Sequence, residues 1–300
     1  MVMPNGDRVR TAAVVGLGTM GRGIVRVLAS RGYRVRCFDP LISEAARTVI
    51  SSLDGVSVSA SLAECVIDAE IVYEAVFEEL AVKKALLIEL SSATSATSAI
   101  IASNTSTFLP SVLARFVSEP ERLLVVHFFN PADVVPLVEI VPHPATGAAI
   151  VERLTAVMKD LGKRPVVVRE ERVGFVANRL QAAILREGLS LVEQGVIEPA
   201  DLDEIVKSGL APRWALAGPV GVADLGGLDI FQALCAQVFP SLDASVTASK
   251  VLTDLVSDGD LGVKTGSGFY SYSEMSTEWM MASMRKLFTV VAELRGADPG

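Results

Sequence analysis

The chain contains little of what marks several large classes of protein. It has 300 residues with 3 cysteines, 2 histidines and 6% aromatic residues, and its 27 lysines and arginines are outnumbered by 35 aspartates and glutamates. A chain with this acidic balance lacks the positive surface that binds nucleic-acid phosphates. No segment approaches the roughly 20 unbroken apolar residues of a membrane helix. We therefore expect neither a nucleic-acid partner nor a membrane, and no metal.

The cysteines and the N-terminal residues indicate where in the cell the protein is expected to be located. Cys37, Cys65 and Cys235 are odd in number and widely separated. Such a set fits a reducing compartment better than a disulfide framework, so we expect a cytoplasmic protein. Residues 1–10 lack the charged, apolar and small segments of a signal peptide, and they are predicted to form a frayed lead-in.

The first half of the chain alternates between two patterns. A short apolar strand at 11–15 is followed by a helical pattern at 19–30, and further strands and helices continue to a strand at 165–168. The strand at 137–141 is taken as part of the same series. This alternation predicts parallel βαβ units in an open, doubly wound α/β sheet.

After Arg172 the pattern changes to long helical segments with no clear strand between them. The second half is therefore predicted to be all helical. The helices are expected at 173–194, 199–210, 223–239 and 246–257, with ordered loops at 209–219 and 262–268.

Gly16, Gly18 and Gly21 form a G-x-G-x-x-G turn directly after a strand and at the start of a helix. The first glycine permits a tight turn, the second lets a pyrophosphate approach, and the third lets the helix pack on the strand. The free N–H groups at the helix N-terminus favour phosphate oxygens. This context favours a dinucleotide site over a purely structural glycine turn.

Asp39 ends the second predicted strand, 18 residues after Gly21 and close to the spacing of about 20 expected for such sites. A carboxylate at this point can accept hydrogen bonds from the adenosine ribose hydroxyls. Pro40 and Leu41 follow, so no arginine is at hand for a 2′-phosphate, and NAD is favoured over NADP. We expect a Rossmann-type NAD-binding domain at 1–171 and a helical substrate and dimerisation domain at 172–300.

Two histidines are the candidates for acid–base chemistry near neutral pH. His127 ends a strand at the edge where doubly wound sheets bind ligands, and Glu139 lies in an otherwise apolar strand and needs a partner. A carboxylate bonded to one imidazole nitrogen fixes the tautomer and favours the imidazolium, so the other nitrogen can take a proton from an alcohol. The alternative is a core histidine, with Glu139 paired to a lysine. His143 lies between two prolines and is predicted to be exposed.

Several ordered motifs run through nearly the whole chain. They are Gly16-Leu17-Gly18-Thr19-Met20-Gly21, Glu74-Ala75-Val76-Phe77-Glu78 with Lys83, Ala102-Ser103-Asn104-Thr105-Ser106, His127-Phe128-Phe129-Asn130-Pro131 with Glu139, Gly174-Phe175-Val176-Ala177-Asn178-Arg179, Gly218-Pro219 with 224–229, and Lys264-Thr265-Gly266-Ser267-Gly268-Phe269-Tyr270. Together they resemble the short, single-function 3-hydroxyacyl-CoA dehydrogenases.

The resemblance implies a catalytic His127/Glu139 dyad, with Ser106 and Asn178 contacting the substrate. It also implies a homodimer formed through the helical half and a role in fatty acid metabolism. The residues expected at the NAD site are Gly16, Leu17, Gly18, Thr19, Met20, Gly21, Asp39, Glu78, Lys83, Asn104, Ser106, Asn130 and Lys264.

Without the resemblance, these side chains have ordinary alternatives. Ser106 is also compatible with a helix cap, and Asn178 with a surface position on a long helix. Lys83 and Lys264, taken singly, fit solvated surface lysines. Their functional interpretation therefore rests on the resemblance.

The chain also departs from the family pattern. Typical acyl-CoA members carry a longer stretch between the residues equivalent to Asp39 and Glu74, with a projecting helical hairpin that helps to grip CoA, and the run 131–136 replaces their P-x-P. The run 211–216 is more like relatives that oxidise free hydroxy acids, such as gulonate and carnitine dehydrogenases. Arg213 in this run suits bidentate binding of a substrate carboxylate, or equally an exposed helix end.

The leading prediction is an NAD-dependent oxidoreductase that interconverts an L-3-hydroxyacyl thioester and its 3-oxoacyl form. A dehydrogenase of a free or carrier-protein-bound 3-hydroxy acid is the alternative on the same fold, and a non-catalytic dinucleotide-binding protein is a third possibility. The β-hydroxyacid dehydrogenases have a similar glycine turn but use a lysine on the first interdomain helix. Residues 173–195 contain no lysine, which disfavours that family.

Overall fold

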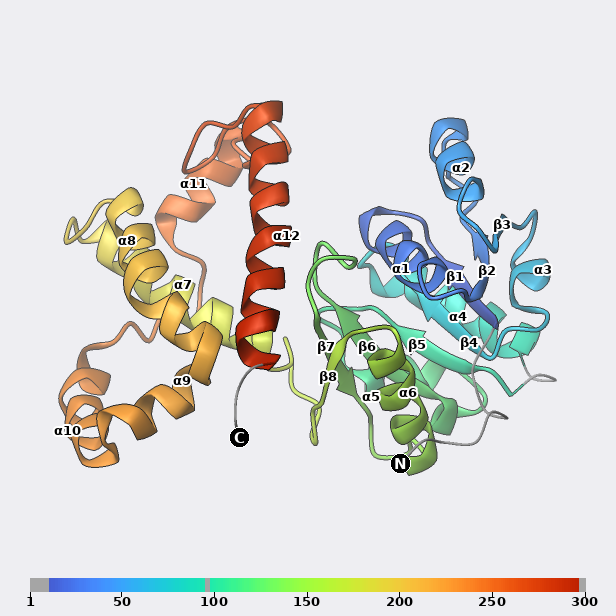
Figure 1. The fold of residues 1–300 in the computed structure, drawn as a ribbon, viewed down its shortest axis with the longest axis horizontal. Coiled ribbons are helices and arrows are strands. Elements are labelled where there is room, and N and C mark those ends of the chain that lie inside the picture. The colour runs from blue at the N-terminus through green and yellow to red at the C-terminus, as the bar shows by residue number, and fades with distance from the viewer. Residues whose placement is uncertain (1–10, 95–97, 297–300) are drawn as a thin grey trace. The chain divides into compact units, whose positions relative to one another are not determined.

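The computed structural model describes residues 11–94 and 98–296, and its contacts divide the chain into two compact units, Met1–Arg179 and Leu180–Gly300 (Figure 1). The lead-in predicted at residues 1–10 lies outside the described residues. The division falls a few residues after the predicted junction at 171/172. The first residues of the helix that follows the sheet belong to the first unit, and the backbone N–H groups of Val176 and Ala177 donate to the side chain of Glu139 in the sheet.

An eight-stranded sheet forms the centre of the first unit, in the order β3-β2-β1-β4-β5-β6-β7-β8. The predicted α/β fold, with a doubly wound sheet followed by helices, is confirmed. The strands are β1 (Thr11–Val15), β2 (Arg34–Phe38), β3 (Val56–Val58), β4 (Ile71–Glu74), β5 (Ile100–Ser103), β6 (Leu123–Phe128), β7 (Leu137–Val141) and β8 (Arg164–Val167).

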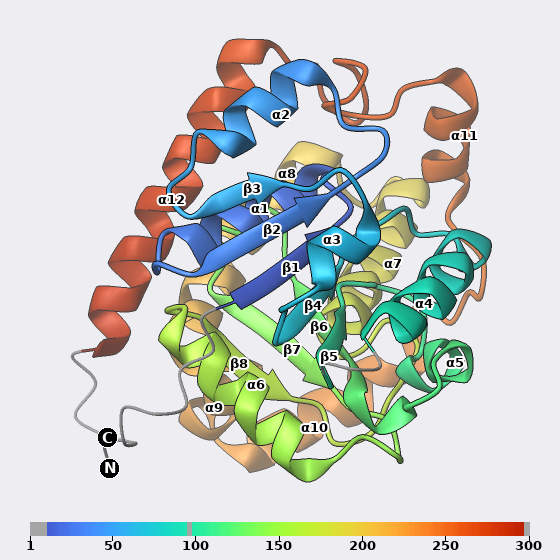
Figure 2. The same ribbon diagram turned by 90° about the vertical axis from the view of Figure 1, so that its right-hand side faces the viewer.

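Helices cover both faces of the sheet, because the buried residues of its strands alternate in the direction they point. In β1, Ala12 and Val14 pack with apolar residues of α1, α2 and α6, whereas Ala13 and Val15 pack with α3, α4 and α5 (Figure 2). The helices are α1 (Thr19–Ala29), α2 (Glu44–Ser51), α3 (Leu62–Val66), α4 (Leu80–Thr94), α5 (Pro110–Leu113) and α6 (Ala148–Asp160).

The pair β6–β7 departs from the predicted parallel series, because these two strands are antiparallel. The eight residues between them, 129–136, are too few for a crossover helix, and a parallel return needs about a dozen residues or more. The peptide bond between Asn130 and Pro131 in this connection is cis. This reversal determines which residues of the two strands lie opposite each other.

The second unit is helical in its described part (Figure 1). A further difference from prediction lies at 209–219, which was expected to be a loop but is largely helical and is broken at Gly218 (φ 70°) before Pro219. No single helix within residues 11–94 and 98–296 is long and apolar enough to cross a bilayer, although the bent pair 199–226 and 228–241 passes that test together. The helices are α7 (Ala177–Glu193), α8 (Pro199–Ile205), a π-helical turn (Val206–Leu210), α9 (Ala211–Gly226), α10 (Leu228–Val238), α11 (Lys250–Asp258) and α12 (Glu274–Gly296).

Candidate active site

The glycine turn connects β1 to α1 and passes close to the end of β4. Gly16 has a φ of +91°, and a Cβ atom there would lie 2.6 Å from the carbonyl carbon of Ala75. A Cβ atom on Gly21 would lie 1.8 Å from the carbonyl oxygen of Gly16, so neither position tolerates a side chain. A Cβ atom on Gly18 would contact nothing within 4 Å. The turn is therefore tightly packed at Gly16 and Gly21 and leaves open space at Gly18.

The N-terminus of α1 suits an anion. Gly18 is its N-cap and supplies no side-chain hydrogen bond, and the first turn of the helix has no acidic residue. The first backbone N–H groups of a helix have no intrahelical partner and carry a partial positive charge. A diphosphate therefore fits this end of the helix, with its close approach permitted by Gly18.

Asp39 lies beside the glycine turn, just beyond the end of β2. One carboxylate oxygen, Oδ2, accepts a hydrogen bond from the N–H of Leu17 at 2.7 Å, and Oδ1 accepts one from the N–H of Leu41 at 2.8 Å. Each carboxylate oxygen has a further lone pair for another donor. The arrangement holds an acceptor where a ribose hydroxyl of a dinucleotide would lie.

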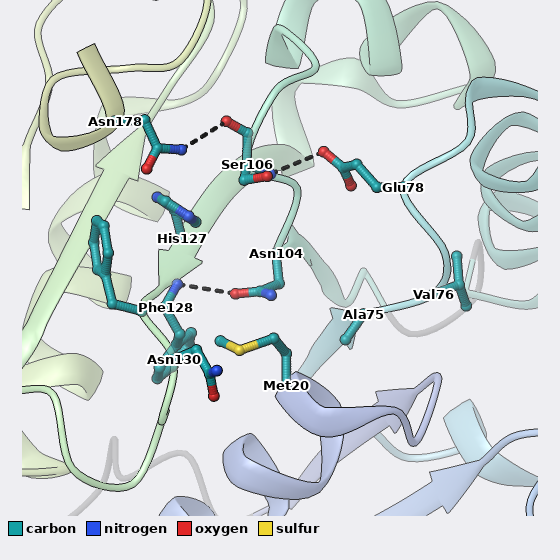
Figure 3. Close-up of a pocket in the computed structure, with 11 residues that line it drawn as sticks. Met20, Ala75, Val76, Glu78, Asn104, Ser106, His127, Phe128, Asn130 and Asn178 are labelled. Atoms are coloured by element: carbon teal, nitrogen blue, oxygen red, sulfur yellow. Dashed lines mark hydrogen bonds between the residues drawn. The ribbon is translucent and has the colours of Figure 1, made fainter. Parts of the chain in front are cut away.

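A pocket of about 380 Å³ opens at the carboxyl ends of the parallel strands in the first unit. Figure 3 shows the polar ends of His127, Ser106 and Asn178 gathered at one side of it, with Met20 and Asn130 at the other. The residues that line it are Met20, Ala75, Val76, Glu78, Asn104, Ser106, His127, Phe128, Phe129, Asn130 and Asn178.

His127 and Glu139 form the buried acid–base pair of this pocket. His127 lies in β6 directly opposite Glu139 in the antiparallel partner β7. The two residues are 5% and 2% exposed. The ring atom Nδ1 of His127 lies 3.1 Å from Oε2 of Glu139. The ring also packs against Phe129 and Phe175, with centroid distances of 4.4 and 5.6 Å. The bond between Nδ1 and Glu139 fixes the orientation of the imidazole and leaves Nε2 as the nitrogen that can exchange a proton with a ligand.

The second carboxylate oxygen of Glu139 binds the start of α7. Oε1 accepts hydrogen bonds from the N–H groups of Val176 at 3.0 Å and Ala177 at 2.9 Å. Burial opposes ionisation of Glu139, but its hydrogen bonds with His127 and with these two N–H groups outweigh burial, so its pKa lies below the ordinary value. The carboxylate is thus held charged beside the histidine.

The polar residues around this pair come from three segments. Asn104 follows β5, and its Oδ1 accepts a hydrogen bond from the N–H of Phe128 at 2.9 Å. Asn178 donates from Nδ2 to the carbonyl oxygen of Ser106 at 3.4 Å. Ser106, Asn178 and Asn130 line the same pocket as His127, so the structure brings these predicted residues together.

Glu78 and Lys83 differ in their access to the pocket. Glu78 lines it, whereas Lys83 is 1% exposed and does not. Burial raises the pKa of Glu78, but hydrogen bonds from Thr105, the charge of Lys83 and a further bond from Thr107 outweigh it, so the net shift is downward. Glu78 is therefore a carboxylate at the edge of the pocket.

Two predicted site residues belong to the second unit and are not among those that line the pocket. They are Arg213, whose Nε donates to the carbonyl oxygen of Gly209 at 2.8 Å, and Lys264. The expectation that His143 is exposed is wrong, because the residue is 8% exposed and its Nε2 lies 2.9 Å from the carbonyl oxygen of Pro120. The burial of His143 could not be predicted, because no sequence pattern indicates that a backbone carbonyl group from a distant segment lies next to it.

The aromatic residues that surround His127, Phe129 and Phe175, were not predicted from the sequence. Phe129 follows the histidine within its motif, and adjacency alone could have suggested it. Phe175 comes from a distant segment, with a φ of +48° directly after Gly174 at +75°. Two successive left-handed residues form the turn that directs the next N–H groups to Glu139. A glycine before a helix gives only a weak hint of such a turn.

Both units match models of one protein family. The 3-hydroxyacyl-CoA dehydrogenase NAD binding domain matches residues 11–50 and 42–171, and the 3-hydroxyacyl-CoA dehydrogenase C-terminal domain matches residues 174–272. The chain belongs to the 3-hydroxyacyl-CoA dehydrogenase family. The resemblance found in the sequence is confirmed, and so is NAD as the cofactor of this NAD-dependent enzyme family.

Members of the family with different substrates resemble this chain. A 5-formyl-3-hydroxy-2-methylpyridine 4-carboxylate 5-dehydrogenase from Mesorhizobium japonicum is 31% identical over 97% of this chain and 100% of its own. A solved structure of an enzyme of that activity, described as an NAD+-dependent dismutase, has a TM-score of 0.88 at 28% identity and covers 97% of this chain and 99% of its own. The (S)-3-hydroxybutyryl-CoA dehydrogenase from Ralstonia eutropha has a TM-score of 0.70 at 32% identity, covering 89% and 100%.

Proposed function

We propose that this family member interconverts a hydroxyl group and a carbonyl group, with His127 as the general acid and base and Glu139 as the residue that orients it. The observation that carries the proposal is the 3.1 Å contact between His127 Nδ1 and Glu139 Oε2 at the wall of the pocket. A bound NAD would supply the acceptor for the hydride that leaves the carbinol carbon, and NADH would supply the donor in the reverse direction.

The proton chemistry belongs to the protein. In the oxidative direction Nε2 of His127 takes the hydroxyl proton, and the charged Glu139 stabilises the resulting imidazolium. In the reductive direction the same nitrogen returns the proton to the developing alkoxide. The polar groups of Ser106 and Asn178 line the pocket beside His127 and suit hydrogen bonding to the reacting oxygen.

One candidate substrate is the L-3-hydroxyacyl thioester that the sequence predicts. Matches to both domain models of the family support it, as does the relative named as an (S)-3-hydroxybutyryl-CoA dehydrogenase. A substrate of this class requires a surface for the phosphates of CoA. Arg213 and Lys264 stay predicted contacts for substrate and cofactor.

A free carboxylic acid bearing the hydroxyl or carbonyl group is the second candidate. The relative that acts on a pyridine carboxylate matches a larger share of this chain and has the higher TM-score. The segment 40–69, where acyl-CoA members carry their longer stretch, holds one arginine and four acidic residues. Such a segment repels the phosphates of CoA more than it attracts them. These observations favour a free acid over a CoA thioester.

A substrate panel followed by NADH consumption tests both parts of the proposal. The panel contains acetoacetyl-CoA, the acetoacetyl thioester of N-acetylcysteamine, free 3-oxo acids and an aromatic aldehyde that carries a carboxylate. We expect turnover with the free acids at a higher kcat/KM than with acetoacetyl-CoA. The reverse order would restore the CoA thioester, and NADH binding without turnover of any member would support a non-catalytic dinucleotide-binding protein.

Two expectations about the whole protein stay proposals. Apolar side chains exposed along the helices of the second unit, such as Val220, Leu225 and Leu228, support the predicted homodimer. Cys37 and Cys65 are buried and form no disulfide, which is compatible with the predicted cytoplasmic location.

A further inference from the structure

Phe175 packs against the acid–base pair from a segment that is distant in the chain. Its ring centroid lies 5.6 Å from that of His127, and the residue is 0% exposed and is not among those that line the pocket. It also packs with Val125 and Val141, which lie directly opposite each other in β6 and β7. Because side chains two residues apart in a strand point to the same face, Phe175 covers the face that carries His127 and Glu139.

The backbone of Phe175 is in a conformation that aromatic residues rarely adopt. Its φ is +48°, directly after Gly174 at +75°, and its N–H donates to the carbonyl oxygen of Arg172 at 2.9 Å. A left-handed conformation is unfavourable for a residue with a bulky side chain, and such strain persists where the surrounding structure enforces it. The contacts that the turn makes explain why the strain is kept here.

The turn directs the start of α7 onto Glu139. The N–H groups of Val176 and Ala177, which follow Phe175, donate to Oε1 of Glu139 at 3.0 and 2.9 Å. The other carboxylate oxygen, Oε2, is left for Nδ1 of His127 at 3.1 Å. Two backbone donors hold the carboxylate against rotation, so the turn determines which of its oxygens faces the imidazole.

The buried ring and the fixed carboxylate act on the same imidazole. A hydrogen bond to a charged group is stronger where water is excluded, because the effective dielectric constant is lower there. An imidazole that keeps its proton on Nδ1 leaves Nε2 free to accept one from a substrate. We propose that Phe175 is a positioning residue for the proton transfer, since its ring keeps water from the His127–Glu139 pair and its backbone aims two N–H groups at the carboxylate. The inference rests on the proposed function, in which His127 is the general acid and base.

Two variants separate the ring from the backbone of the turn. Phe175→Leu keeps a buried apolar side chain and the same backbone strain but removes the ring beside His127. Gly174→Ala keeps the ring and makes the left-handed conformation of the turn less favourable. A Cβ atom at this position would lie 3.6 Å from Cγ of Arg179, which is an ordinary contact, so the variant strains the backbone without a clash.

Each variant has a matched control away from the acid–base pair. Gly195→Ala makes the same substitution at another left-handed glycine, with a φ of +68° and no atom within 4 Å of a Cβ atom. Phe116→Leu removes a ring that packs on the apolar cluster between the sheet and α3, α4 and α5. Neither control residue is among those that line the pocket. A difference between a variant and its control therefore reports on the acid–base pair and not on a general loss of stability.

The imidazole of His127 can be observed directly, because the chain has 2 histidines. NMR of the full chain labelled with ¹⁵N-histidine shows which ring nitrogen carries the proton at a pH where the ring is neutral, and His143→Gln assigns the signals. The wild type should show a single tautomer with the proton on Nδ1. Both variants should show a mixture of the two tautomers, and both controls should match the wild type.

Kinetics for the best substrate of the panel and fluorescence titration with NADH complete the test. For Phe175→Leu and Gly174→Ala we expect kcat to fall about tenfold, because a small displacement of a reacting group is enough for such a loss. KM and NADH affinity should each stay within about threefold of the wild type, since neither residue lines the pocket.

The contrary outcomes are distinct. A single Nδ1-protonated tautomer in either variant would overturn the proposal whatever happens to kcat, and a mixture of tautomers with kcat unchanged would overturn the role in proton transfer. A raised KM with kcat retained would place the effect at the substrate contact of Asn178 instead, and equal changes in variants and controls would reduce Phe175 to a structural role. A wild-type chain that turns over no substrate would refute the proposed function, while the tautomer measurement, which needs no substrate, would still decide whether the turn positions the pair.

Discussion

His127 and Glu139 lie directly opposite each other in the antiparallel pair β6–β7. Directly opposed side chains of such a pair are close on the same face of the sheet, with Cβ atoms about 5 Å apart. The antiparallel pairing therefore places both members of the acid–base pair on adjacent strands of the sheet. A parallel return would have separated the two residues by a crossover connection.

Replacement of His127 tests the catalytic assignment. His127→Gln keeps a polar side chain but removes the group that exchanges the proton, so we expect kcat to fall by about 100- to 10,000-fold. NADH affinity, measured by fluorescence titration, should stay near that of the wild type. His143→Gln is the matched control because it alters the other histidine, which bonds Pro120. Substantial turnover by His127→Gln would remove this residue from its proposed role.

Glu139→Gln tests the orienting role. The amide oxygen can still accept the N–H groups of Val176 and Ala177, while its NH₂ group replaces the charged oxygen beside His127. The imidazolium then loses its anionic neighbour, and kcat should fall by about tenfold or more with a changed pH profile. The measurement is kcat against pH for both proteins. An unchanged profile would mean that Glu139 does not act on the histidine.

The sequence was sufficient for the parts of the molecule that depend on local pattern. The glycine turn, Asp39 and the pairing of His127 with Glu139 could be predicted because each has its own spacing or an evident need for a partner. The burial of Lys83 could not, since a lysine in a helix gives no sign of the two carboxylates that surround it. The antiparallel direction of β7, by contrast, could have been predicted, because the eight residues between β6 and β7 are too few for a parallel crossover.

Asp39→Gly tests the cofactor preference. Loss of the carboxylate removes the acceptor for the ribose hydroxyls and the negative charge that disfavours a 2′-phosphate. We expect NAD affinity to fall about tenfold or more, as for the loss of a charged hydrogen bond, with a much smaller loss for NADP. Asp39→Asn is the control, because it can still accept the N–H of Leu17. Equal losses for the two cofactors would contradict the assignment.

Lys163 binds the segment 129–136 that connects the two strands of the acid–base pair. It is 8% exposed, and its Nζ donates to the carbonyl oxygen of Ala132 and, at 2.8 Å, to that of Val135. Burial lowers its pKa from 10.5 to about 8, against the opposing charge of Asp133. A buried ammonium held mainly by carbonyl groups is stabilised less than one in water.

The sign of this shift gives a prediction for stability. Between about pH 8 and about pH 10 the unfolded chain keeps the Lys163 proton while the folded chain releases it, so the folded state gains stability from this group as the pH rises. The free energy of unfolding of the wild type, relative to Lys163→Met, should therefore increase by on the order of 2 kcal/mol over that range. Urea unfolding at each pH measures it, and Lys159→Met, which alters an exposed lysine of α6, should show no such trend. A difference that stays constant with pH would mean that Lys163 remains charged in the folded protein.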